Sequence, residues 1–222
     1  MTHWPLVPIL FCTYAHSAAR TEYAIRAVCG IKTYLDYPNL AFYLADAGSP
    51  AEHSGRILER LGLHMPILGD HNVTRTPGAN WNAGIQEILN HADVYLRMED
   101  DFELQNKIDL RPYVEVLYDR KDVGMMRLGL LPIDLIMTTA GYNGRIYQHM
   151  HKNVPYCYSG NPGLIHRRFH EDYGYYDETV GPGDCEVEMD WHVRDTEGPA
   201  IWRPNELGDY GVFAHIGEEQ SY

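Results

Sequence analysis

The chain has 222 residues, of which 45% are apolar, so it is long enough for one sizeable α/β core and does not require a second domain. Its formal charge of −13 disfavours nonspecific attraction to nucleic acid or to an anionic membrane surface. No N-terminal stretch combines a basic start with a long apolar run, so we expect a protein that is neither exported nor embedded in a membrane.

Apolar strands and amphipathic helices alternate through the first hundred residues. Residues 8–14 predict a strand that is buried on both faces, and Ser17 suits the N-cap of a helix that ends before Pro38. Residues 40–45 predict the second strand, and a second helix contains Ile57, Leu58 and Leu61. A short third strand is expected at 65–68, a third helix follows the Pro77-Gly78 turn, and residues 94–98 predict a fourth strand.

The pattern is looser in the second half of the chain. It predicts a helix at 112–118, a strand at 123–128, a Gly- and Tyr-rich stretch to about residue 158, a turn and strand at 159–166, a helix at 186–194 and a short strand at 200–202. The fold class that follows is α/β, a single domain over 1–222 whose mostly parallel sheet is flanked by helices. In such sheets ligands bind beyond the carboxyl ends of the strands.

Three consecutive acids, Glu99-Asp100-Asp101, directly follow the fourth predicted strand. Carboxylates at this spacing repel one another unless a cation lies between them. Ligands that are all oxygen favour Mg²⁺ or Mn²⁺, and Mg²⁺ commonly completes its coordination with water and substrate phosphates. The triplet therefore indicates a metal site, and the alternative is an ordinary solvated acidic turn.

The four cysteines are widely spaced and contain no C-x-x-C pair. Cys12 and Cys29 fall in apolar stretches, where a small hydrophobic side chain packs well. We expect reduced thiols and a cytoplasmic location.

The order of these segments resembles glycosyltransferase family 2 and its relatives with the GT-A fold, over most of the chain. In that family the first strand ends in a Thr-Tyr/Phe segment with an Arg soon after, which Thr13-Tyr14 and Arg20 match loosely. The second strand ends in an Asp followed by Gly-Ser, matched by Asp46-Ala47-Gly48-Ser49, and a later Gly-containing loop carries Asn-x-Gly-Ile, matched by residues 82–85. The D-x-D element is matched by residues 99–101 as a Glu variant.

This resemblance implies a Rossmann-like GT-A domain that binds a nucleotide-sugar donor, with a UDP-sugar favoured and a GDP-sugar possible. Asp46 would bind the base or ribose, and Tyr14 would pack on the base. The donor set implied by the resemblance is Thr13, Tyr14, Arg20, Asp46, Arg75, Asn82 and Asp100. Arg75 enters because Trp81 stands where the family often carries Arg. Asp101, Glu99 and His215 would hold Mn²⁺ or Mg²⁺ at the diphosphate.

The resemblance also implies a general base near residues 181–188. Many family members have an acidic segment that opens a helix and deprotonates the acceptor hydroxyl, and Glu186 aligns best with it, with Asp184 as competitor. An inverting displacement needs such a base within hydrogen-bond reach. The alternative is a helix N-terminus enriched in acids, which the helix dipole favours.

The acceptor is expected to bind residues 105–222, and the donor residues 1–104. Residues 135–170 contain no Asp or Glu, while Tyr residues alternate with basic ones, of which Arg145, Arg167 and Arg168 are the candidate acceptor contacts. We hold two acceptor hypotheses: a glycan or protein hydroxyl, or, disfavoured by the charge, a hydroxymethylated base of DNA such as some phages carry, which would put the enzyme in a host cytoplasm. A solvated basic face is the alternative.

Two other functions remain open from the residues. A nucleotidyltransferase uses a similar sheet and metal, but its Gly-rich phosphate loop normally follows the first strand, and there is no glycine between Met1 and Cys29. A catalytically inactive sugar or nucleotide binder would keep the same crevice without turnover.

Overall fold

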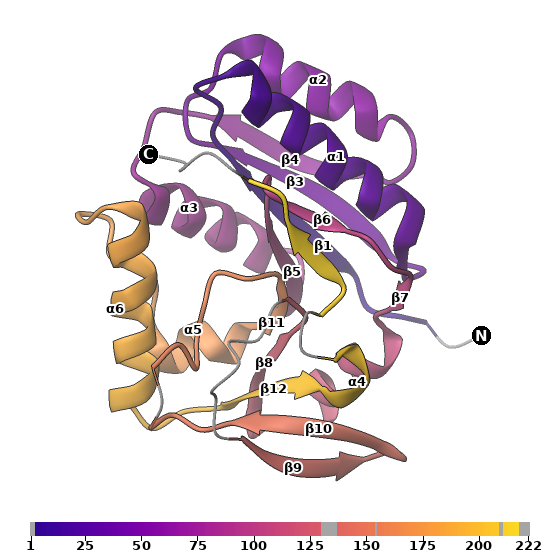
Figure 1. Cartoon of the computed structure of the whole chain (residues 1–222), viewed down its shortest axis with the longest axis vertical. Helices are drawn as coiled ribbons and strands as arrows, with labels where there is room; N and C mark the ends of the chain where they lie inside the picture. The colour runs from indigo at the N-terminus through magenta and orange to yellow at the C-terminus, as the bar shows by residue number, and fades with distance from the viewer. Residues whose placement is uncertain (1–2, 130–136, 154, 209–210, 218–222) are drawn as a thin grey trace.

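The computed structural model describes residues 3–129, 137–153, 155–208 and 211–217. In this part of the chain the central feature is a nine-stranded sheet of order β4-β3-β1-β5-β11-β8-β12-β10-β9 (Figure 1). Its strands are β1 (Val7–Thr13), β3 (Leu40–Asp46), β4 (Ile67–Asn72), β5 (Val94–Glu99), β8 (Val123–Arg127), β9 (Met137–Tyr142), β10 (Arg145–Met150), β11 (Gly163–His166) and β12 (Ala200–Pro204). Strands β10 and β11 run against the other seven, so the predicted mostly parallel α/β sheet is confirmed.

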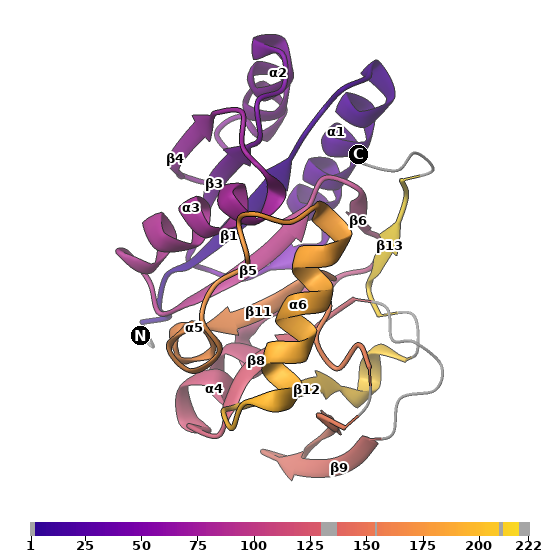
Figure 2. The same ribbon diagram turned by 90° about the vertical axis from the view of Figure 1, so that its left-hand side faces the viewer.

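Six helices cover the two faces of this sheet in the described part of the chain. They are α1 (Ala18–Tyr34), α2 (Ala51–Leu61), α3 (Pro77–Leu89), α4 (Arg111–Asp119), α5 (Arg167–Tyr173) and α6 (Pro182–Asp195). Helices α1, α2 and α4 share one apolar cluster with Ile9 and Phe11, whereas α3, α5 and α6 share the other with Leu10 and Cys12. Figure 2 shows the second group on the side turned toward the viewer.

Strand β1 shows why the sequence pattern predicted a doubly covered strand. Successive side chains point to opposite faces of a sheet, and every residue of Val7–Thr13 is buried because both faces carry helices. The predicted cap of the next helix is confirmed, since the Ser17 hydroxyl accepts a hydrogen bond from the Arg20 N–H.

Several elements differ from the sequence expectation. The third strand lies at Ile67–Asn72 and not at 65–68, because Met65 packs into the core while the later residues pair with β3. Helix α6 begins at Pro182, four residues before the predicted start, since proline suits the first helical turn. Helix α5 was not predicted.

The Gly- and Tyr-rich stretch contains a hairpin, β9–β10, that the pattern did not predict. Tyr142 pairs with Arg145 across a two-residue turn, Asn143-Gly144, and both turn residues have positive φ. This is the backbone that an Asn-Gly turn favours, so the dipeptide was an available signal. Residues 135 and 136 of the acid-free stretch lie outside the described residues.

Two short pairings complete the fold. Strand β13 (Phe213–His215) pairs antiparallel with β6 (Phe102–Leu104), so the end of the described chain lies beside the acidic triplet (Figure 1). Strands β2 (Leu35–Asp36) and β7 (Ile108–Asp109) form the second pair, and a short 3₁₀ helix covers Asn205–Leu207.

All four cysteines are free thiols, as expected. Within the described ranges, no helix has both the length and the apolar character needed to cross a membrane.

Candidate functional site

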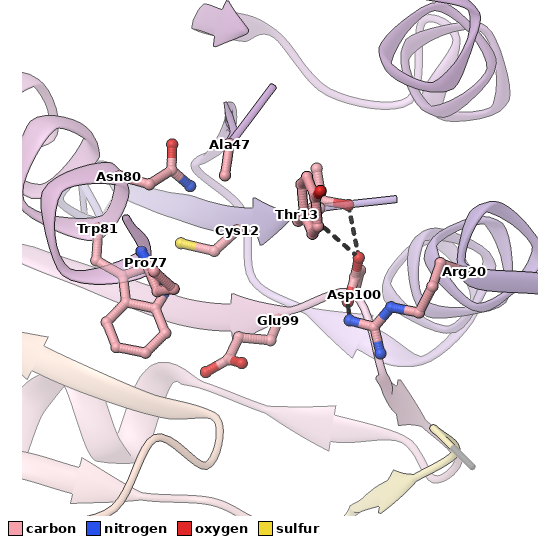
Figure 3. A pocket seen from close by; sticks show the side chains of 10 residues that line it. Cys12, Thr13, Arg20, Ala47, Pro77, Asn80, Trp81, Glu99 and Asp100 are labelled. Carbon is pink, nitrogen blue, oxygen red and sulfur yellow. Dashed lines mark hydrogen bonds and ion pairs between the residues drawn. The ribbon is translucent and has the colours of Figure 1, made fainter. Parts of the chain in front are cut away.

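A pocket opens at the carboxyl ends of β1 and β5, where the sheet pattern predicted a crevice (Figure 3). Five of the predicted site residues line it, namely Thr13, Tyr14, Arg20, Glu99 and Asp100. The other lining residues are Cys12, Ala47, Pro77, Asn80 and Trp81. In Figure 3 the Asp100 side chain lies between Thr13 and Arg20, whereas Glu99 lies on the side of Trp81.

One side of the pocket is a cluster of Arg20, Asp100, Asp101 and His215, here called the Arg20 cluster. The Arg20 guanidinium contacts Asp100 Oδ1 and lies 3.2 Å from Asp101 Oδ2, which is 3.4 Å from His215 Nε2. Burial raises the pKa of Asp100 to about 7, against the opposing charge of Arg20. Burial also acts to raise the pKa of Asp101, but the hydrogen bond to His215 and the charge of Arg20 outweigh it, so this pKa is lowered.

A chain of buried hydrogen bonds connects this cluster to α2. The Thr13 hydroxyl donates to Asp100 Oδ2 at 2.6 Å, so it must accept from His53 Nε2, 2.7 Å away. His53 Nδ1 then accepts from the Thr21 hydroxyl at 2.9 Å. Burial lowers the pKa of His53, which agrees with the neutral ring that this pattern requires.

The predicted metal ligands are only partly assembled. Asp101 and His215 are in contact, and within the described part of the chain Asp101 Oδ1 is buried without a hydrogen-bond partner, as expected of an oxygen that binds a ligand. Glu99 instead pairs with Arg97 at 2.7 Å. Across the described residues, no group of three or more His, Cys, Asp or Glu side chains forms a metal-binding set. The metal role of Asp101 and His215 stays a prediction.

The other side of the pocket is a cluster of Arg97, Glu99 and Glu186, here called the Arg97 cluster. One guanidinium nitrogen, Nη2, lies 2.7 Å from Glu99 Oε1 and 3.6 Å from Glu186 Oε1. Burial raises the pKa of Glu99 well above its usual range, and the charge of Arg97 opposes this shift. The structure thus brings the predicted base Glu186 next to the acidic triplet. Its competitor Asp184 is exposed at the start of α6.

Three predicted donor contacts lie away from this pocket. Asp46 is fully buried and holds its own turn, accepting from the N–H groups of Gly48 and Ser49 at 3.2 and 2.8 Å and from the Ser54 hydroxyl. Asn82 donates to the Tyr176 carbonyl at 2.9 Å, and Arg75 is exposed. Their contacts with a donor stay predictions.

The three candidate acceptor arginines each contact groups of the chain itself. Arg145 pairs with Glu206, and Arg167 pairs with Asp93 at 2.7 Å. Arg168 donates to the carbonyls of Leu117 on α4 and Val123 on β8 at 2.7 Å, so it connects the C-terminal end of α4 to β8. A role for these residues in acceptor binding stays a prediction.

Among the ionisable side chains that contact the site residues, sequence reasoning missed His53 and Arg97. His53 follows the turn after the second strand on an ordinary amphipathic helix, and nothing local distinguished it. Arg97 carried a usable signal, because a charged residue inside an otherwise apolar buried strand is rare unless it is paired. Trp81, interpreted as core packing, is indeed buried, and it also lines the pocket.

No family model and no curated protein matches the chain. Solved structures, in contrast, match most of the chain. S. aureus TarS bound to UDP-GlcNAc matches with a TM-score of 0.65 and 12% identity over 98% of this chain and 62% of its own. The mannosyltransferase PcManGT from Pyrobaculum calidifontis, in complex with GDP-Man and Mn²⁺, matches with a TM-score of 0.56 and 17% identity over 95% and 54%.

The catalytic domain of Drosophila β1,4-galactosyltransferase 7 matches with a TM-score of 0.52 and 14% identity over 96% of this chain and 71% of its own. The chain spans 38% to 62% of the length of the TarS chains it matches. At these identities the likeness concerns the fold. The chain therefore has the fold of the GT-A-type glycosyltransferases.

Proposed function

We propose that the chain is a glycosyltransferase that moves a sugar from a nucleotide-sugar donor to an acceptor hydroxyl. The observation that carries this proposal is the Arg20 cluster, in which a buried carboxylate oxygen of Asp101 has no hydrogen-bond partner among the described residues, beside a pocket at the carboxyl ends of parallel strands. The fold supports it, because S. aureus TarS binds UDP-GlcNAc and PcManGT binds GDP-Man on the same fold. We favour a UDP-sugar, as the sequence resemblance implies, over a GDP-sugar.

The donor diphosphate would bind together with Mn²⁺ or Mg²⁺. Asp101 Oδ1 and the His215 imidazole are the groups that would hold the ion, and such ions commonly complete their coordination with water and phosphate oxygens. A bound divalent cation supplies positive charge against the departing diphosphate. Arg20 adds a fixed positive charge at the same corner, and Asp100 anchors Arg20 through its contact with that guanidinium.

Glu186 would act as the general base of an inverting displacement. Its carboxylate takes the proton of the acceptor hydroxyl while the oxygen bonds to the anomeric carbon, and the bond from that carbon to the phosphate oxygen breaks, releasing the nucleoside diphosphate. The side chain is about one third exposed, so an acceptor can reach it. Asp184 is a weaker candidate because it lies outside the Arg97 cluster.

The favoured acceptor is a hydroxyl of a glycan or protein. A hydroxymethylated DNA base is the second hypothesis, disfavoured by the charge of −13 and by the internal partners of Arg167 and Arg168. In this proposal residues 1–104 bind the donor and residues 105–222 the acceptor. The free thiols suit work in the cytoplasm.

A thermal-shift panel of UDP- and GDP-sugars with Mn²⁺ tests the proposal, since a ligand that binds only the native state raises the melting temperature. Donor hydrolysis and transfer are then assayed for the donor that binds. We expect Asp101→Asn to abolish both activities, and Asp195→Asn, which changes an exposed aspartate at the end of α6, to leave them unchanged.

If no donor binds, the proposed function is wrong. If a donor binds without turnover, the chain is an inactive binder, and nucleotide transfer to a sugar phosphate would mark a nucleotidyltransferase.

A further inference from the structure

Arg97 is a charged residue in the middle of the sheet. It lies on β5, is 1% exposed, and pairs in register with Leu10 of β1 and Gly163 of β11. Burying a guanidinium costs free energy unless opposite charges and hydrogen bonds compensate it. Such a residue is retained where its contacts serve a purpose that an apolar residue cannot serve.

The contacts of Arg97 fix both the position and the plane of its guanidinium. Nη1 donates to the Tyr158 hydroxyl at 3.3 Å, and Nη2 is shared by Glu99 and Glu186. Two aromatic rings pack against the group, with the guanidinium carbon 4.3 Å from the Trp81 ring centre and 5.3 Å from that of Tyr176. Aromatic rings attract a guanidinium and restrict its rotation.

The surrounding chain leaves little space for the carboxylate of Glu186 to move. A Cβ placed on Gly160 would lie 1.7 Å from Glu186 Oε1 and 3.0 Å from Arg97 Nη1. Any other residue at position 160 would therefore displace Glu186 or Arg97. The loop packs its backbone directly against this ion pair.

The charges in the cluster are suited to a general base. Two carboxylates close together repel, and without a cation one of them takes up a proton. One guanidinium contacts both carboxylates and offsets part of their repulsion, so Arg97 can hold Glu186 next to Glu99. The pairing of Arg97 with Glu186 also connects β5, in the proposed donor half, to α6, in the proposed acceptor half.

We propose that Arg97 is a positioning residue that sets the place of the Glu186 carboxylate relative to the donor pocket. The inference rests on the proposed function and deepens it. Arg97 itself touches neither substrate, and it acts through the carboxylate it holds. A purely structural ion pair would affect stability alone.

The test compares Arg97→Met and Arg97→Lys with the wild type in steady-state transfer assays across pH. For Arg97→Met we expect kcat to fall about 100-fold with the donor KM little changed, because a misplaced reacting group costs about this much. The acidic limb of the pH profile should move to higher pH, since the carboxylates lose their opposite charge. Arg97→Lys keeps the positive charge but lacks the planar guanidinium. The acidic limb of its pH profile should therefore lie where it does in the wild type, while its kcat should be about tenfold below the wild-type value.

Arg194→Met is the matched control, because Arg194 pairs with Asp190 at 3.8 Å on the same helix, outside the site. It should leave kcat and the pH profile unchanged. The double variant Arg97→Met, Glu186→Gln should be no slower than Glu186→Gln alone, since residues that act as a unit are not additive.

Normal kcat and pH profile in Arg97→Met overturn the inference while the proposed function stands. Additive losses in the double variant also overturn it. If Arg97→Met does not fold, unchanged kcat in Arg97→Lys overturns it. A wild type that binds no donor and transfers no sugar overturns the function and this inference together.

Discussion

The two arginine clusters beside the end of β5 have similar charges and different construction. In each, a buried guanidinium contacts two carboxylates. In the Arg20 cluster Asp100 accepts from Thr13 and from the Tyr14 N–H, and one oxygen of Asp101 has no hydrogen-bond partner in the ranges that the structure describes. In the Arg97 cluster the two carboxylates come from residues 87 positions apart, and Glu186 is partly exposed. In the first arrangement both carboxylates are buried, which suits them to hold a cation, whereas in the second Glu186 is exposed enough for an acceptor to reach it.

The difference originates in the geometry of a strand end. Adjacent side chains point to opposite faces, so Glu99 lies on the side of α3 and α6 while Asp100 lies on the side of α1 (Figure 3). One acidic triplet thus supplies carboxylates to two different sites. The predictions below probe this division.

The largest effect is expected from Glu186→Gln. Loss of a general base typically lowers the rate by about 10²–10⁴-fold, and the amide cannot take the acceptor proton. Donor binding should be kept, because the Arg20 cluster is intact. Steady-state kinetics of this variant beside Asp184→Asn decide between the two candidate bases. A larger loss of kcat in Asp184→Asn than in Glu186→Gln would show that Asp184, and not Glu186 of the Arg97 cluster, is the general base.

Arg20→Met should destabilise the fold, because it leaves Asp100 and Asp101 buried without their cation. Breaking a buried ion pair costs about 3–5 kcal/mol. Mn²⁺ should restore part of this loss by placing positive charge between the carboxylates. Urea unfolding with and without Mn²⁺ measures both effects. Arg26, on the same helix as Arg20, forms a more exposed pair with Glu103 of β6, so Arg26→Met should cost less than about 1 kcal/mol. Equal losses of unfolding free energy in Arg20→Met and Arg26→Met would contradict a buried ion pair in the Arg20 cluster.

His53→Ala tests the hydrogen-bond chain that holds Asp100. It removes the acceptor of the buried Thr21 hydroxyl, at about 1–3 kcal/mol, and the donor to the Thr13 hydroxyl, which keeps only its bond to Asp100. Urea unfolding measures the loss, and donor titration should show weaker binding as Asp100 becomes less well held. His64→Ala, an exposed histidine just after α2, is the control. If His53→Ala is destabilised but binds the donor with unchanged affinity, the hydrogen bonds from His53 through Thr13 to Asp100 have only a structural role.

The smallest effect is expected from His215→Gln and depends on pH. The hydrogen bond to Asp101 raises the pKa of His215 above its usual 6.5, so this contact stabilises the fold below pH 6.5 and the stabilisation disappears as pH rises through the raised value. The side chain is half exposed, so the gain is below about 1 kcal/mol. The wild type should exceed the variant in unfolding free energy at about pH 6 and lose that advantage near pH 9. A difference that stays constant with pH would rule out the Asp101–His215 ion pair.

Local sequence was sufficient for the elements whose signals are short-range. The apolar runs of β1, β3 and β5, the Ser17 cap and the position of the acids after β5 were all predicted, because periodicity and capping depend on neighbouring residues. The start of α6 and the β9–β10 hairpin were missed, although a proline and an Asn-Gly turn marked them.

The amino-acid sequence by itself determined that acidic and polar residues gather at the carboxyl ends of a mostly parallel sheet, since the alternation of strands and helices in the first half of the chain implies parallel strands. Only the tertiary structure decided which cation each carboxylate meets. Glu99 turns to Arg97 and Glu186, Asp101 turns to Arg20 and His215, and Asp46 turns inward to its own loop. These partners come from segments far apart in the chain, and their pairing depends on packing across both faces of the sheet, which no local pattern records.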